Sequence, residues 1–189
     1  MSEHIVGVEP KEYNGRKYRS TLEAETAKLL DEMGLPWEYE TKKITLQEGF
    51  YCDFQKKKVR EIEYIPDFCI GPIMLETKGY ETPDWKIKKK LLFKYLKENK
   101  PDAIFYMVKN NKQLLEALDN HWAYLGFCVE VVSKPDKKHN SGIHKFDSIK
   151  QAMLDLGLKG KSMTSVLRSL TGRTEYVYGY KWNLVKLKL

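Results

Sequence analysis

Three charged side chains interrupt a segment that is otherwise mostly apolar, YIPDFCIGPIMLETKGY at residues 64–80. They are Asp67, Glu76 and Lys78, and charged groups are rarely buried unless they are paired or bind a metal. If Glu76 and Lys78 lie on one strand, they point to the same face, because side chains alternate along a strand. Asp67 ends the preceding strand, so a hairpin can bring its carboxylate beside that of Glu76. We therefore predict a pair of carboxylates with a lysine next to them.

Two converging carboxylates repel each other unless a cation joins them, and oxygen ligands suit the hard cations Mg²⁺ and Mn²⁺. A neighbouring lysine can orient or deprotonate water, or neutralise the charge of a phosphate under attack. These residue types together predict phosphodiester hydrolysis. An Asp followed by a loosely spaced Glu-x-Lys also arises by chance. Here the proline before Asp67 and the strand-like surroundings of Glu76 favour a site.

A helix expected at residues 20–34 supplies a candidate for a third carboxylate. Ser20 can cap this helix, Glu23 stands three residues later as in a capping box, and Gly34 can end the helix. Glu23 therefore has two readings, as the capping partner of its own helix or as a metal ligand. Glu25 lies on a different face of the helix, where we expect it to be solvated.

The surrounding elements predict a body of mixed helices and strands. Residues 1–18 look irregular, whereas residues 47–68 resemble a hairpin whose tip is basic. Hydrophobic periodicity and turn residues predict strands at 37–46, 73–79, 103–108 and 128–132, and helices at 83–100 and 112–126. A meander followed by alternating helix and strand indicates an α/β or α+β fold.

The last part of the chain has the pattern of a separate module. Residues 133–145 are rich in Pro, Gly, Ser, Asn and Lys and have no periodicity, so we expect a linker there. Two short helices, expected at 148–158 and 161–172, are joined by a tight turn with a glycine, which is the layout of a helix-turn-helix unit. The predicted organisation is a first domain at 1–132, the linker, and a small module at 146–189.

Charge is distributed unevenly along the chain, which has 189 residues and a net charge of +7. From Lys134 onward there are 12 basic and 4 acidic residues, a net charge of +8, so the rest of the chain is close to neutral. A basic segment beside a neutral body suggests a module that binds a polyanion. A solvated tail would have the same composition.

The sequence also indicates a cellular setting. It has no long apolar run, and its N-terminus lacks the basic-then-apolar layout of a signal peptide. Its three cysteines, Cys52, Cys69 and Cys128, are far apart and have no metal-ligand spacing. We therefore expect no membrane partner, no disulfide scaffold and no zinc cluster, and we expect a reducing, cytoplasmic environment.

The motif PDF…LETKG resembles the signature of PD-(D/E)xK nucleases. The fuller run YRSTLEAETAKLLDEMGLPWEYE…YIPDF…LETKGY…KKKLL is similar to the phage endonuclease I family of Holliday-junction resolvases, over roughly residues 16–108. This resemblance implies a restriction-endonuclease-like mixed sheet flanked by helices. It also implies a metal site of Glu23, Asp67 and Glu76 that binds Mg²⁺ or Mn²⁺, with Lys78 as the catalytic lysine.

The same resemblance implies a homodimer in which the subunits exchange elements. The chain departs from the family in two places. The hairpin at 47–68 looks longer than its counterpart, and residues 134–189 do not look like the family's own C-terminus. Both departures bear on the substrate, because junction binding depends on the shape of the dimer.

The C-terminal run FDSIKQAMLDLGLKGKSMTSVLRSLTGRTEYVYGYKWNLV resembles the nuclease-associated modular DNA-binding domain of homing endonucleases. The matching features are SI-x-x-A in the first helix, LG at its end, Ser and Thr in the second helix, a following G, and GY-x-W. In such a module the second helix would enter the major groove. The polar residues that it offers to DNA are Lys161, Ser162, Thr164, Ser165 and Arg168. Tyr180 and Trp182 are expected in the small core rather than stacked on bases.

A group of lysines lies early on the helix expected at 83–100. Lys86, Lys89 and Lys90, together with Lys88, could guide a phosphate backbone along the protein. A solvated helix face explains the same lysines equally well.

We interpret the chain as a metal-dependent DNA endonuclease that resembles a free-standing homing endonuclease of phage type, in the cytoplasm of a bacterial or phage-infected cell. Its C-terminal module would choose the site on double-stranded DNA. One alternative is a structure-selective junction resolvase or debranching nuclease that acts on branched DNA. Another is a DNA-binding protein without catalysis, although the intact set Glu23, Asp67, Glu76 and Lys78 argues against it.

Overall fold

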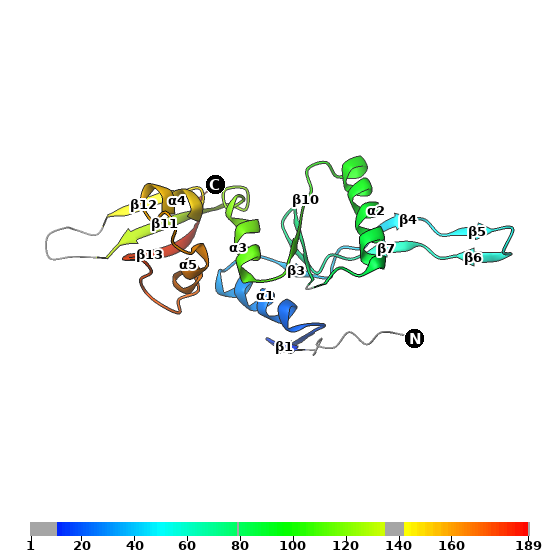
Figure 1. Cartoon of the computed structure of the whole chain (residues 1–189), viewed down its shortest axis with the longest axis horizontal. Coiled ribbons are helices and arrows are strands. Elements are labelled where there is room, and N and C mark those ends of the chain that lie inside the picture. Colours follow the sequence, from blue (N-terminus) through cyan, green and yellow to red (C-terminus); the bar gives the residue numbers. More distant parts are fainter. Residues whose placement is uncertain (1–10, 79, 135–141, 189) are drawn as a thin grey trace. The chain divides into compact units, whose positions relative to one another are not determined.

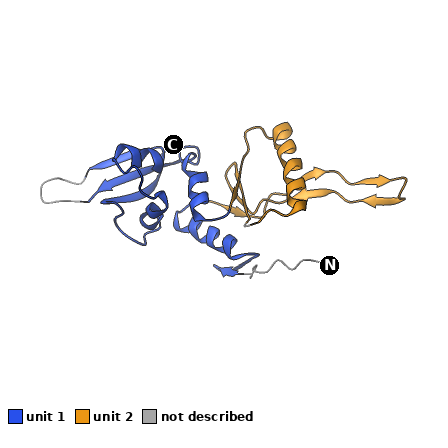
Figure 2. Ribbon diagram, in the orientation of Figure 1, with its two compact units in different colours: residues 1–35, 109–189 blue, residues 36–108 orange. Residues whose placement is uncertain are grey.

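The fold was obtained as a computed structural model, which describes residues 11–78, 80–134 and 142–188 (Figure 1). The chain forms two compact units (Figure 2). Unit 1 comprises residues 1–35 and 109–189, and unit 2 comprises residues 36–108. Helices and several sheets occur together, which confirms the expected α+β class. The narrower expectation of a restriction-endonuclease-like fold stays a prediction.

Unit 2 is built around a mixed four-stranded sheet in the order β10-β9-β8-β3. Strands β9 and β10 are parallel, while β8 is antiparallel to both β9 and β3. The elements of this unit, in chain order, are β3 (Glu38–Tyr39), β4 (Ile44–Gln47), β5 (Phe50–Cys52), β6 (Lys57–Val59), β7 (Ile62–Tyr64), β8 (Phe68–Ile70), β9 (Ile73–Thr77), α2 (Pro83–Asn99) and β10 (Ile104–Val108).

One helix covers part of this sheet. Helix α2 has Thr82 as its N-cap and a proline in its first turn, both of which favour a helix start. Its apolar side buries Trp85, Leu92 and Leu96 in a cluster with Tyr64 and Met74 from the strands. This cluster fixes the helix against the side of the sheet on which Met74 lies.

A long two-stranded hairpin runs from β4 to β7 and carries β5 and β6 at its far end (Figure 1). The expected hairpin is therefore confirmed. The expected continuous strand at 37–46 is wrong, because the chain splits it into β3 and β4, which pair in different sheets. Glu40 lies between them with φ of 51°, a left-handed conformation outside the β region, so the regular strand is interrupted there.

Unit 1 begins, in the described part of the chain, with a hairpin of β1 (Lys11–Tyr13) and β2 (Arg16–Tyr18). The expectation of an irregular segment at 1–18 is therefore wrong over residues 11–18, and residues 1–10 lie outside the described residues. Asn14 and Gly15 form the turn with φ of 50° and 73°, as a tight hairpin turn requires. Helix α1 (Thr21–Glu32) follows with Ser20 as its N-cap, as expected.

The second part of unit 1 surrounds a three-stranded sheet in the order β12-β11-β13. Its elements are α3 (Asn111–Asp119), β11 (Phe127–Ser133), β12 (Ile143–Phe146), α4 (Ile149–Asp155), α5 (Met163–Leu170) and β13 (Tyr180–Lys186). The two expected short helices are confirmed as α4 and α5. Trp182 of β13 is fully buried, as expected of a core residue.

This sheet contradicts the expected division into domains at 1–132 and 146–189. Strand β11 is its central strand and pairs with β12 on one side and β13 on the other, so it belongs with the C-terminal segment. The expected linker at 133–145 is also wrong at its ends, because Ser133 closes β11 and residues 143–145 lie in β12. Residues 135–141 of that linker lie outside the described residues. Non-local strand pairing, which composition does not reveal, is the reason for the difference.

In the part of the chain that the structure describes, no helix combines the length and the apolar content needed to cross a membrane.

Candidate active site

The β8–β9 hairpin brings two of the predicted carboxylates face to face. Ile70 pairs with Ile73 across a two-residue turn, in which Gly71 has φ of 56°, a conformation that favours glycine. Phe68 pairs with Leu75, and extending this register by one residue sets Asp67 opposite Glu76. The local sequence thus places both acids at the open end of a tight hairpin, as expected.

Both acids are buried, Asp67 and Glu76 each with 7% of their surface exposed. Burial raises the pKa of Glu76 to about 7, and the negative charge of Asp67 contributes in the same direction. A hydrogen bond from Tyr64 and the charge of Lys78 oppose this rise in the pKa. The pair therefore holds negative charge that its surroundings stabilise only in part, which is the electrostatic situation that attracts a cation.

Strand β9 fixes the orientation of the Asp67 carboxylate. Its Oδ2 accepts hydrogen bonds from the backbone N–H of Thr77 at 2.7 Å and from the Thr77 hydroxyl at 2.8 Å. Thr77 is itself buried, with 7% of its surface exposed. Thr77, which lies between Glu76 and Lys78 in the sequence, therefore anchors the carboxylate of Asp67.

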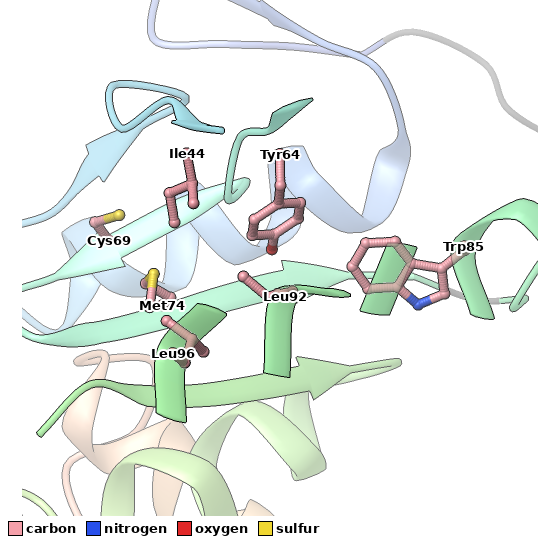
Figure 3. Close-up of a cluster of buried hydrophobic side chains, with 7 residues drawn as sticks. All are labelled: Ile44, Tyr64, Cys69, Met74, Trp85, Leu92 and Leu96. Carbon is pink, nitrogen blue, oxygen red and sulfur yellow. The ribbon is translucent and has the colours of Figure 1, made fainter. Parts of the chain in front are cut away.

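Tyr64 fixes the orientation of the Glu76 carboxylate. Its hydroxyl donates a hydrogen bond of 2.9 Å to Oε2 of Glu76. The tyrosine ring belongs to the apolar cluster under α2, where its centroid lies 5.6 Å from that of Trp85 (Figure 3). Burial and the charge of Glu76 raise the pKa of Tyr64 far above its ordinary value, so the hydroxyl keeps its proton and stays a donor.

Lys78 lies just after β9 and faces the same acid. Its Nζ is 3.7 Å from Oε1 of Glu76 and 4.8 Å from the ring centroid of Trp85. The backbone N–H of Lys78 donates to the carbonyl of Val108, which continues the pairing of β9 with β10. The side chain remains 30% exposed. Lys78 is therefore held by an acid and an aromatic face while its ammonium can still meet a ligand.

The donor set fits a hard divalent cation. Asp67 and Glu76 supply carboxylate oxygens from rigid strands, and their mutual repulsion is relieved when a cation lies between them. In the described part of the chain, no group of three or more His, Cys, Asp and Glu side chains gathers in a way that could hold a metal ion. The predicted third ligand, Glu23, belongs to unit 1, and the three-carboxylate set stays a prediction.

Within unit 1, Glu23 has the capping role that its position predicts. Its Oε1 accepts a hydrogen bond from the Ser20 hydroxyl and its Oε2 accepts one from the backbone N–H of Arg19, each at 3.0 Å. The Ser20 hydroxyl in turn accepts from the backbone N–H of Glu23 at 3.2 Å. Glu23 is 6% exposed, whereas Glu25 is exposed as expected.

The predicted lysines of α2 differ in their surroundings. Lys86 and Lys90 are exposed, as a contact with a phosphate backbone requires. Lys89 is half-buried and forms an ion pair with Glu81, so part of its charge is already compensated. Lys86 and Lys90 are therefore the better candidates for contact with a polyanion.

Helix α5 carries the polar residues predicted to contact DNA, with differences in exposure. Lys161 and Ser162 come just before the helix and are exposed, Thr164 and Ser165 are half-buried, and Arg168 is exposed. Within unit 1, a pocket beside this face is lined by polar residues of α5 together with Leu29, Asn111 and Arg173.

The start of α5 is fixed by a tyrosine on the segment before β13. The Tyr178 hydroxyl accepts from the backbone N–H of Ser162 and donates to its carbonyl, both at 3.1 Å. Lys161 lies over the same ring, with Nζ 5.7 Å from its centroid. These contacts hold Lys161 and Ser162 beside the helix they precede.

Three residues of the site were not predicted from the sequence. Tyr64, Thr77 and Trp85 orient Glu76, Asp67 and Lys78 respectively. Two of them are close in the sequence to predicted residues. Tyr64 lies three residues before Asp67, and Thr77 lies between Glu76 and Lys78. No spacing rule points to Trp85, which reaches Lys78 through the packing of α2.

Comparison of the chain with protein-family models, with curated proteins and with solved structures found no match.

Proposed function

We propose that this protein is a metal-dependent DNA endonuclease that hydrolyses phosphodiester bonds. The observation that carries this proposal is the buried pair Asp67 and Glu76 with the ammonium of Lys78 3.7 Å from Glu76. Two carboxylates and an ammonium at one end of a hairpin suit a reaction in which a bound cation and that ammonium share the charge of a phosphate.

In this proposal Asp67 and Glu76, both in unit 2, bind Mg²⁺ or Mn²⁺. When bound, the ion supplies Lewis-acid stabilisation of the phosphate and makes water a stronger nucleophile. Tyr64 and the backbone of β9 hold the carboxylates in place, so no reorganisation is needed when the substrate arrives. Lys78 places a positive charge where the phosphate oxygens gain negative charge.

The proposed substrate is double-stranded DNA, and the α4–α5 module is proposed to choose the site. The net charge of +8 from Lys134 onward supports this assignment, because cations that neutralise phosphates provide the sequence-independent part of binding. The exposed side chains Lys161 and Arg168 are the contacts we expect from this module. Such an enzyme would be a free-standing homing endonuclease of phage type, acting in the cytoplasm of a bacterial or phage-infected cell.

A structure-selective nuclease is the second candidate. The resemblance of residues 16–108 to junction resolvases favours it, and the homodimer with exchanged elements is part of this proposal. In this case the C-terminal module adds general affinity for branched DNA and does not recognise a particular DNA sequence.

One assay distinguishes the candidates. Wild type, Glu76→Ala and the matched control Glu25→Ala are incubated with Mg²⁺ and either a four-way junction or a long duplex library. A unique duplex cut or nick that only Glu76→Ala loses supports the homing-type enzyme. Symmetric junction cleavage without a preferred duplex site supports the resolvase. Retained cleavage by Glu76→Ala would falsify the assigned site, and DNA binding without any cleavage by wild type supports a non-catalytic DNA-binding protein.

A further inference from the structure

The far end of the long hairpin in unit 2 exposes three aromatic side chains. Phe50, Tyr51 and Phe54 expose 50%, 60% and 89% of their surface. Single exposed apolar residues are common, but a cluster at one tip indicates a surface that something covers. A two-stranded ribbon in water is only marginally stable, so an apolar tip that lacks a partner adds a further cost.

The register of β5 and β6 distributes these groups over both faces of the ribbon. Tyr51 is paired with Lys58, while the neighbouring pairs are Phe50 with Val59 and Cys52 with Lys57. Paired residues share a face and successive residues alternate between faces. Each face therefore carries one exposed aromatic ring and one lysine. A ribbon that is similar on both faces suits a binding site with two walls rather than a flat surface.

The tip is also strongly basic. Four cations, Lys56, Lys57, Lys58 and Arg60, are exposed, and Asp53 is the one carboxylate between Phe50 and Arg60, which leaves a net charge of +3. Among the residues that the structure describes, none forms an ion pair with these four cations. Their charge is therefore available to an external partner.

We propose that the β5–β6 ribbon enters a groove of duplex DNA, with its cations against the phosphates of both walls and Phe54 against the base pairs. Two-stranded ribbons can lie in the major or in the minor groove, and apolar wedges between base steps are typical of minor-groove binding. Phosphates match the cations on both faces, and an apolar side chain at the apex can press between base steps. This inference deepens the proposed function and depends on it for the identity of the substrate.

A second copy of this chain is a poorer partner for the same tip. Its own tip would bring the same net charge of +3 toward the first, and like charges repel. DNA offers negative charge on two walls, and the flat faces of its bases become accessible where a base step is unstacked. The combination of rings and cations on one ribbon thus favours the nucleic acid.

The charge of the tip is tested by binding in EDTA, where no cleavage occurs. The full chain, the variant Lys56→Gln/Lys57→Gln/Lys58→Gln and the control Lys94→Gln/Lys97→Gln/Lys100→Gln bind a labelled 40-bp duplex between 50 and 200 mM KCl. The control removes three exposed lysines of unit 2 and gives the same net charge. We expect the tip variant to bind roughly tenfold more weakly or worse, with a salt slope smaller by about 2 to 3. Equal losses in the two variants would overturn the inference.

The aromatic apex is tested in the same duplex carrying 2-aminopurine. Phe54→Ala is expected to bind about tenfold more weakly and to lose the rise in fluorescence that unstacking produces. The control Tyr124→Ala removes a ring that is 60% exposed in unit 1 and should bind as wild type does. Unchanged affinity and fluorescence of Phe54→Ala would overturn the inference. A wild-type dimer that becomes a monomer in Phe54→Ala would also overturn it, in favour of contact between copies.

The same proteins are then assayed with Mg²⁺, which separates this inference from the proposed function. If wild type binds DNA through the tip but cuts no DNA, the ribbon inference is supported and the endonuclease proposal fails. If wild type cuts DNA and both tip variants bind and cut equally well, the endonuclease proposal is supported and the ribbon inference is overturned.

Discussion

The carboxylate of Asp119, at the end of α3, accepts the backbone N–H of Ile149 at the start of α4 with a distance of 2.7 Å. The same carboxylate accepts from the backbone N–H of Lys150 at 3.0 Å and from the indole N–H of Trp122 at 2.9 Å. Asp119 is 2% exposed, so these donors replace the water that its charge would otherwise bind. One acid thus joins the end of α3 to the start of α4.

Replacing Asp119 by Asn should destabilise unit 1. The amide keeps the shape but loses the charge and turns one acceptor into a donor that faces another donor. We expect the free energy of unfolding to fall by about 2–3 kcal/mol, measured by urea denaturation. The control Asp155→Asn changes an exposed acid on α4 whose partner is the Gln151 amide. This substitution should change the free energy of unfolding by less than about 0.5 kcal/mol. Equal effects of the two substitutions would contradict the role of Asp119.

Ending the chain after Ser133 should unfold more than the C-terminal module. Strand β11 would lose both of its neighbours, and two exposed edges of a buried strand cannot be satisfied. We expect the truncated protein to lose cooperative unfolding of unit 1 and the slow amide exchange of residues 127–133. A truncated protein in which these amides remain as protected as in the full chain would show that β11 has other support.

Replacing Tyr64 by Phe should move the pH dependence of cleavage. The tyrosine hydroxyl stabilises the ionised form of Glu76, so its removal raises the pKa of Glu76 further. If Glu76 acts as a ligand, activity at pH 7 should fall about three- to tenfold and recover at higher pH. The measurement is the pH–rate profile with Mg²⁺, with exposed Tyr124→Phe as the control. A uniform loss at all pH values would indicate a purely structural effect.

The stability of the metal-free protein should depend on the ionisation of Glu76. Its pKa is about 7 in the folded protein and about 4.5 in an unfolded chain, so the folded state binds the proton more tightly. The protonated Glu76 carboxyl group therefore contributes fully to stability below pH 4.5. This contribution is lost as the pH rises through about 7. We expect a loss on the order of 2 kcal/mol in wild type, which Glu76→Gln does not show.

That difference is measured by urea denaturation in EDTA at pH 5 and pH 8, comparing wild type with Glu76→Gln. Other groups titrate over the same range, and the variant corrects for them. Mg²⁺ should stabilise wild type more at pH 8 than at pH 5, because the ionised carboxylates bind it. Identical pH dependence in the two proteins would contradict the raised pKa.

Arg168→Ala should weaken DNA binding without changing the fold. Arg168 is exposed on α5, so its removal should leave the stability of unit 1 within about 0.5 kcal/mol of wild type. A lost phosphate contact reduces affinity on all sequences and lowers the salt slope by about 1, whereas a lost base contact relaxes the preference at one position. Unchanged affinity and unchanged slope would remove this residue from the interface.

Local patterns predicted the acids of the site well. Asp67 and Glu76 are joined by a tight hairpin, so the ten residues 67–76 are enough to place them together. The α1 start at Ser20 is local in the same sense. Asn14 followed by Gly15 is an equally local signal for a hairpin turn. The prediction of an irregular segment at 1–18 did not use this signal.

The features that were not predicted depend on contacts between distant segments. Strand β11 finds its second neighbour, β13, about fifty residues later in the chain, and no composition rule reveals this pairing. Tyr64 reaches Glu76 because both β7 and β9 lie under α2. Lys78 meets Trp85 for the same reason. The types of the catalytic candidates follow from sequence, whereas the groups that orient them follow from packing.

The interruption of unit 1 by unit 2 sets an order of events during synthesis. Unit 2 is continuous from Pro36 to Val108, so all of its strands and its helix leave the ribosome before α3 does. Helix α1, made first, has to wait for the second part of its own unit, which is complete only when β13 has emerged. At about 5–20 residues per second, this delay is roughly 8 to 30 seconds. Through that interval α1 can already contact the β1–β2 hairpin, whereas the second part of unit 1, from residue 109 onward, has not yet been made.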